Sequence, residues 1–198
     1  IERVRLGIEV GLEVFGPPAG AAGMQVRWRD FAESPCLVGT MSQQQRASCF
    51  QGAMKRRPER LVGRAADTLA GLLPSRGIDT FEGKHCLDSI LGGKHVHVDG
   101  WANLFIGTCV GIIAGRVGSA GLDGFWRAFD WREHPVLSLL GQNGPLGLLP
   151  EAARQGYKIL SGYSSKCHLC FELRRFLYPR GVFADYLGPG VCYGTKKQ

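Results

Sequence analysis

The sequence predicts a mixed fold, between α/β and α+β, and three stretches indicate it. Apolar residues recur at helical spacing over residues 1–15, and the alternating stretch 24–29 has the period of a half-buried strand. A second alternating stretch, 94–98, is followed by an Asp-Gly turn and a second strand-like stretch, 103–106, a pattern that predicts a β-hairpin. Because helical patterns return after the hairpin, helices and strands are expected to share one architecture.

The other elements are predicted from apolar periodicity and from the positions of glycine and proline. Ser42 is an N-cap candidate for a helix over 42–57, and Pro58 suits the first turn of a second helix with an apolar stripe. That stripe consists of Leu61, Ala65, Leu69 and Leu72. Further helices are expected at 122–131, 135–140, 146–155 and from Lys166 or Cys167 to Leu177, and a loop at 185–190.

The composition is that of an ordinary globular chain with an excess of glycine. Of the 198 residues, 44% are hydrophobic and 21% are charged, so extensive disorder is not expected. The 29 glycines are about twice the usual share of roughly 7% and indicate many tight turns. No apolar run reaches the roughly 18–20 residues that span a bilayer, and the first residues lack the apolar core of a secretory signal.

Four of the seven cysteines are predicted to form one metal site. An odd cysteine count does not suit a fully paired disulfide framework, so a reducing, cytoplasmic compartment is expected. Cys167 and Cys170 form a C-x-x-C pair at the start of a predicted helix, where the helix N-terminus favours the thiolate. Cys86 and Cys109 lie just outside the two ends of the predicted hairpin. Because the hairpin folds the chain back, these two thiols are expected to complete the ligand set.

Four cysteine ligands suit either tetrahedral zinc or a [4Fe–4S] cluster. Structural zinc usually takes two close pairs of ligands, whereas here only one pair is close, so the spacing favours the larger iron–sulfur cluster. Zinc and the absence of any metal stay as alternatives. A redox dithiol at Cys167 and Cys170 would leave Cys86 and Cys109 without a role, and the strand that precedes a thioredoxin-type motif is lacking.

The other thiols and the histidines are interpreted as structural. Free cysteine behaves as a small hydrophobe, and a histidine outside a ligand set usually finds a hydrogen bond. For His95 and His97, which lie on one face of the first hairpin strand, contact with a metal or a substrate is the alternative. His168, inside the C-x-x-C pair, is expected to face solvent or to bond a backbone carbonyl. The other residues in this group are Cys36, Cys49, Cys192 and His85.

Two segments resemble the auxiliary-cluster regions, of SPASM or twitch type, of radical S-adenosylmethionine (SAM) proteins. In residues 95–112, a strand, an Asp-Gly turn and a second strand lead to Cys109. Residues 163–170 are similar to the later cysteine pair of such regions. The resemblance covers about residues 80–192, although the spacing from the turn to Cys109 is longer than the common SPASM pattern.

This resemblance implies two segments, 1–79 as the closing part of a partial (β/α) barrel and 80–198 as the auxiliary-cluster region. It implies a [4Fe–4S] cluster used for electron transfer or structural support, in an enzyme acting on a peptide or a small molecule. The cluster ligands that it implies are Cys86, Cys109, Cys167 and Cys170.

The defining C-x-x-x-C-x-x-C loop, which binds the cluster that cleaves SAM, is not in this sequence. Cys36, Cys49 and Cys86 lie too far apart to supply it. The chain, which begins with Ile1, is therefore expected to be the C-terminal part of a radical SAM enzyme, with the radical-generating core upstream as its partner.

The net charge of +7 permits contact with anions, and the sequence contains one dense basic run. This run is predicted to be a solvated helix face, because no aromatic residues interleave with it to stack bases. A zinc-stabilised module that binds nucleic acid is the alternative function, and no membrane contact is expected. The basic run consists of Lys55, Arg56, Arg57, Arg60 and Arg64.

Overall fold

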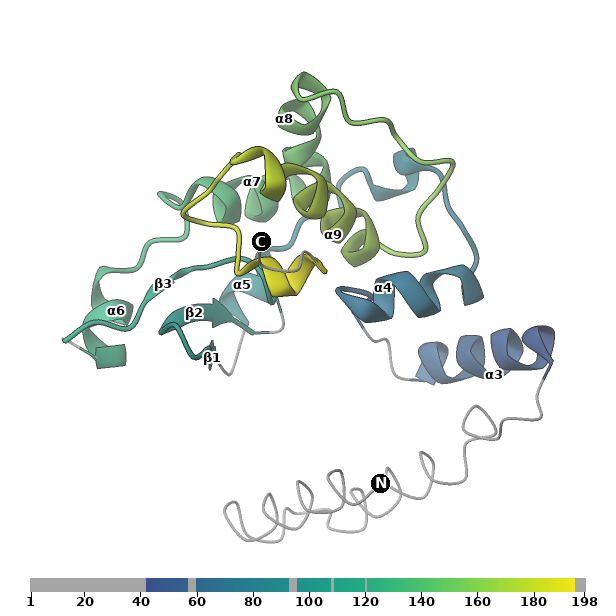
Figure 1. Cartoon of the computed structure of the whole chain (residues 1–198), viewed down its shortest axis with the longest axis horizontal. Coiled ribbons are helices and arrows are strands. Elements are labelled where there is room, and N and C mark those ends of the chain that lie inside the picture. Colours follow the sequence, from purple (N-terminus) through teal and green to yellow (C-terminus); the bar gives the residue numbers. More distant parts are fainter. Residues whose placement is uncertain (1–41, 57–59, 93–95, 108, 120, 195–198) are drawn as a thin grey trace, which may run out of the picture. The chain divides into compact units, whose positions relative to one another are not determined.

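The computed structural model describes residues 42–56, 60–92, 96–107, 109–119 and 121–194 (Figure 1). The chain divides into two compact units, Ile1–Ala53 and Met54–Gln198. The helix predicted at 1–15, the strand at 24–29, Cys36 and His95 lie outside the described residues. The predicted division into segments 1–79 and 80–198, with a partial barrel in the first, stays a prediction.

Ser42 caps α3 (Gln43–Arg56), as its position predicts. The Gln45 amide donates to Ser42 Oγ at 3.3 Å, and the Ser42 amide donates to Gln45 Oε1 at 2.9 Å, so each residue satisfies one amide of the other.

The second helix begins later than predicted, at α4 (Arg64–Leu69). Gly63 precedes it with a φ of 56°, a left-handed conformation that interrupts helical backbone, and residues 60–62 are not helical. As a result, the residues that are buried in this region differ in part from the predicted apolar stripe. The buried residues here are Leu61, Ala66 and Ala70.

A three-stranded antiparallel sheet contains the predicted hairpin. β1 (Val96–Val98) pairs with β2 (Asn103–Ile106), and β2 also pairs with β3 (Gly115–Arg116), which the sequence pattern does not indicate. Asp99 holds the turn, since its carboxylate accepts from the Trp101 and Asn103 amides, both at 2.9 Å. All four residues of β2 are buried, because it is the central strand of the sheet.

The later helices follow the prediction with shifted ends. α7 (Pro135–Asn143), α8 (Leu149–Arg154) and α9 (Lys166–Leu177) all pack against the 3₁₀ helix η4 (Gly144–Leu148) (Figure 1). α6 (Gly121–Ala128) ends before the predicted residue 131. The remaining short helices are η2 (Ala70–Leu72), η3 (Ile78–Phe81), α5 (Leu87–Leu91), η5 (Tyr178–Arg180) and η6 (Gly190–Tyr193).

Helices and sheet share one apolar core, so the described residues form an α+β fold. β2, α7, η4 and α9 contribute side chains that are almost fully buried, and each such leucine stabilises the fold by about 1.5–3 kcal/mol. None of the helices that the structure describes combines the length and apolar character needed to cross a membrane. The leucines concerned are Leu104, Leu137, Leu140, Leu148, Leu169, Leu173 and Leu177.

His134 caps α7 from a buried position. Its Nδ1 accepts from the Val136 and Leu137 amides at 3.2 and 3.1 Å, and its Nε2 lies 2.9 Å from the Ile113 carbonyl oxygen. These partners require an acceptor at Nδ1 and a donor at Nε2, which is the neutral imidazole. Burial lowers the pKa of His134 below its usual 6.5, although the bond to the Ile113 carbonyl opposes this.

Because the pKa of His134 is lower in the folded chain, the unfolded chain takes up the proton first as the pH falls. The contribution of neutral His134 to the stability of the fold is complete above about pH 6.5 and is lost as the pH falls through the pKa of His134 in the folded chain. We expect the free energy of unfolding in urea to decrease more between pH 7.5 and pH 5.0 for the wild type than for His134→Asn, which keeps a cap acceptor but does not titrate. Equal decreases in the two proteins would contradict this assignment.

Candidate metal centre

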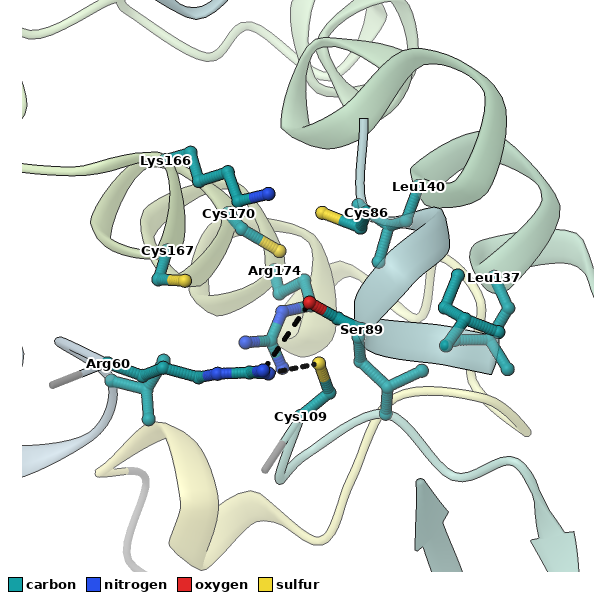
Figure 2. A pocket seen from close by; sticks show the side chains of 13 residues that line it. Arg60, Cys86, Ser89, Cys109, Leu137, Leu140, Lys166, Cys167, Cys170 and Arg174 are labelled. Atoms are coloured by element: carbon teal, nitrogen blue, oxygen red, sulfur yellow. Dashed lines mark hydrogen bonds between the residues drawn. The ribbon is translucent and has the colours of Figure 1, made fainter. Parts of the chain in front are cut away.

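The four cysteines predicted as ligands line one pocket (Figure 2). Cys86 precedes α5, Cys109 follows β2, and Cys167 and Cys170 lie on the first two turns of α9. All four are free thiols. Figure 2 shows their side chains directed into the same space. The pocket contains about 490 Å³ of empty space, part of it open to solvent.

The N-cap of α9 sets the direction of two thiols. Ser165 has extended backbone and its Oγ accepts from the His168 amide at 3.1 Å, so the helix begins at the next residue, Lys166. Residues three apart lie on one face of a helix, so Cys167 and Cys170 point the same way. Arg174 comes one turn further on that face and also lines the pocket.

A close backbone approach places Cys86. Its amide donates to the Leu140 carbonyl of α7 at 2.8 Å. At the end of α7, Gly144 has a φ of 60°, and a Cβ there would lie 2.1 Å from the Lys84 carbonyl oxygen. Only glycine fits at this point, and it lets the segment that carries Cys86 pack against α7.

A tight turn places Cys109 after β2. The Cys109 amide donates to the Ile106 carbonyl at 3.3 Å, and the Ile112 amide donates to the Cys109 carbonyl at 3.2 Å. Gly111 has a φ of 90°, and a Cβ there would lie 2.8 Å from Tyr193 Oη and 3.0 Å from Arg174 Nη1. The turn therefore fits closely against α9 and η6.

Three cations line the pocket with the thiols, and no carboxylate is among the described residues that line it. Arg60 donates from Nη1 to Cys109 Sγ at 3.1 Å, and Lys166 donates from Nζ to the His85 carbonyl at 2.9 Å. Arg174 is 2% exposed. A guanidinium does not lose its proton in proteins, so the pocket is positively charged when the thiols are neutral.

The buried Arg174 guanidinium is only partly satisfied. Its Nη1 donates to the Val110 carbonyl at 3.0 Å and to Tyr193 Oη at 3.2 Å. Its Nε has no hydrogen-bond partner among the residues that the structure describes. A buried donor without a partner costs stability.

Burial holds three of the thiols, those of Cys86, Cys167 and Cys170, in the neutral form. Burial raises the pKa of Cys86 to about 12, and the neighbouring Cys170 adds to the shift. Burial also raises the pKa of Cys167 and that of Cys170. The positive charge of Arg60 opposes the rise at Cys167, and that of Arg174 opposes the rise at Cys170. Burial therefore outweighs the effect predicted for the helix N-terminus, and a bound metal must displace the thiol protons.

The thiols surround the pocket without meeting at one point. In the described part of the chain, no group of three or more His, Cys, Asp or Glu side chains is arranged so that it could hold a metal ion as it stands. The arrangement thus offers four sulfur donors around a common space.

The remaining sequence predictions have mixed outcomes. His168 does not face solvent or bond a carbonyl: its Nδ1 accepts from the Ser164 amide at 3.2 Å, and its Nε2 lies 3.6 Å from Glu172 Oε1. His85 and His97 are exposed, and Cys192 lies outside the pocket lining. Cys49 lies in α3, and its side chain is outside the described set.

The basic run requires a correction at Arg60. The residue was predicted to lie on a solvated helix face, but residues 60–62 are not helical and its guanidinium contacts the thiol pocket. Nothing in the local sequence around Arg60 indicates this. Arg174, by contrast, follows Cys170 by four residues, so helical spacing was a usable signal for it.

No family model, curated protein or solved structure matches this chain. The resemblance to radical SAM auxiliary regions therefore depends on the residues quoted for it above.

The raised pKa of Cys86 has a direct chemical consequence. A rise from 9.0 to about 12 lowers the thiolate fraction at pH 8 by about three orders of magnitude. In the folded, metal-free protein we expect iodoacetamide to alkylate Cys86 at least about 100-fold more slowly than in urea, as followed by peptide mass spectrometry. A short cysteine peptide in each reaction corrects for the effect of solvent on the reagent. Similar rates in the folded and unfolded chain would contradict the prediction.

Proposed function

We propose that this region binds a [4Fe–4S] cluster and serves as the auxiliary-cluster region of a radical SAM enzyme. The observation that carries the proposal is that four cysteines from three separate parts of the chain line one pocket with no carboxylate among its described lining residues. The bound cluster would supply one-electron transfer. The ligands are Cys86, Cys109, Cys167 and Cys170.

The sulfur donors and the charges that line the pocket suit a [4Fe–4S] cluster. The four sulfur donors line a common space, which suits a cluster whose irons lie apart, whereas one zinc ion needs every ligand sulfur about 2.3 Å away. Arg174, which lines the pocket, would place a positive charge beside the bound cluster. The cations beside the thiols would offset the negative charge of four thiolates.

Ligation by four cysteines leaves no iron open to a substrate, which supports electron transfer or structural support rather than substrate binding. The chain's own task is to hold the thiolates and keep them from water, with the leucines of α7 lining part of the pocket. In the same proposal, the enzyme is cytoplasmic and acts on a peptide or a small molecule. Residues 1–79 would form part of a partial barrel, and the core that cleaves SAM would lie elsewhere.

Anaerobic reconstitution tests the cluster and its ligands. We expect about four iron and four sulfide ions per chain, with the absorption and reduced-state EPR spectra of a [4Fe–4S] centre. The double variant Cys167→Ala/Cys170→Ala should lose the cluster, because half of the ligands are gone.

Cys192→Ala is the matched control, since this thiol is free and half-buried in the same unit but does not line the pocket. It should bind iron like the wild type. One zinc and no iron per chain would support the zinc module instead, and no bound metal would overturn both.

The auxiliary role is tested separately with SAM. Because four cysteines would occupy all four irons, the reconstituted chain with dithionite should release no 5′-deoxyadenosine from SAM, as measured by liquid chromatography. Release of 5′-deoxyadenosine by the chain alone would show that the cluster has an open iron and would contradict the auxiliary assignment.

A further inference from the structure

Arg60 contacts one of the four pocket thiols directly. Its Nη1 donates to Cys109 Sγ at 3.1 Å, and its Nη2 donates to Ser89 Oγ at 3.4 Å (Figure 2). Ser89 lies on α5 and Cys109 in the turn after β2, so one guanidinium joins two separate elements at the edge of the pocket. The planar fork of arginine suits such two-point contact, which fixes the orientation of the donor toward sulfur.

Lys166 provides a natural comparison within the same pocket. It also lines the pocket and carries one positive charge, but its Nζ donates to the His85 backbone carbonyl at 2.9 Å. The two residues therefore differ in what they donate to: Arg60 bonds a sulfur, and Lys166 bonds a carbonyl. Arg174 is unsuitable for such a comparison, because it is fully buried and also holds the Cys109 turn to η6.

We propose that Arg60 is a positioning residue that raises the reduction potential of the cluster through its hydrogen bond to Cys109 Sγ. The inference rests on the proposed function, because it requires a cluster bound to that sulfur. One-electron reduction adds one negative charge to the cluster and its thiolates, and no covalent bond forms or breaks. A charge-assisted hydrogen bond to a ligand sulfur becomes stronger as that negative charge grows.

The donor therefore stabilises the reduced cluster more than the oxidised one. It acts at short range, where the surrounding protein screens it less than water would. A cation without a bond to sulfur contributes only its charge, which falls off with distance and screening. The proposal thus predicts that Arg60 affects the potential more than Lys166 does, although each substitution removes one charge.

Arg60→Met and Lys166→Met form the matched pair for the test, since methionine keeps much of the side-chain length without charge or donor. The reconstituted proteins are titrated anaerobically with dithionite as the one-electron donor, and the reduced cluster is followed by EPR. We expect Arg60→Met to lower the equilibrium constant for reduction about tenfold, a shift of about 59 mV to more negative potential. The shift in Lys166→Met should be clearly smaller.

Two further variants keep the proposal testable if Arg60→Met does not accept the cluster. Arg60→Lys keeps the charge but cannot bridge both acceptors, so its potential should lie between those of the wild type and Arg60→Met. Ser89→Ala removes the second anchor of the guanidinium and should shift the potential in the same direction by less.

The outcomes separate this inference from the proposed function. A wild-type cluster whose potential is unchanged in Arg60→Met, Arg60→Lys and Ser89→Ala would overturn the role of Arg60 and leave the cluster proposal standing. Equal shifts in the two methionine variants would show a general charge effect and would also overturn it. If the wild type binds no cluster, both proposals fail.

Discussion

The burial of the Arg174 guanidinium is the constraint on which the thiol pocket depends. A charge without water must be met by oxygen or sulfur, and here the Val110 carbonyl and Tyr193 hydroxyl meet it. Tyr193 in turn donates to the Gly111 carbonyl, and glycine is required there because a Cβ would collide with both polar side chains. One cation on α9 thereby holds the turn that carries Cys109 and the C-terminal η6 beside the cysteine pair.

The same pocket brings cations and buried thiols together. Burial keeps Cys86, Cys167 and Cys170 protonated, so the cations that line the pocket face neutral sulfur. Loss of the thiol protons to a metal would give those cations negative partners and would lower the cost of their burial. Under the proposed function, metal binding and folding of this region would support each other.

How far the sequence could predict the fold depends on the range over which each pattern acts. The Asp-Gly hairpin and the helix that Ser42 caps were predicted, since alternation, turn chemistry and capping all act within a few residues. β3 was missed because two residues are too few to show alternation. The start of α4 was predicted wrongly, because Pro58 suggested an early start and the φ of Gly63 prevents it.

The sequence by itself determined the candidate thiols, since a C-x-x-C pair at a helix start and two cysteines flanking a hairpin are local features. Only the tertiary structure decided that these thiols line one pocket and that Arg60 and Arg174 join them. The physical reason is that packing of apolar faces, and the close approaches at Gly111 and Gly144, act between segments far apart in the chain. No spacing along the sequence encodes which charge will be buried beside which sulfur.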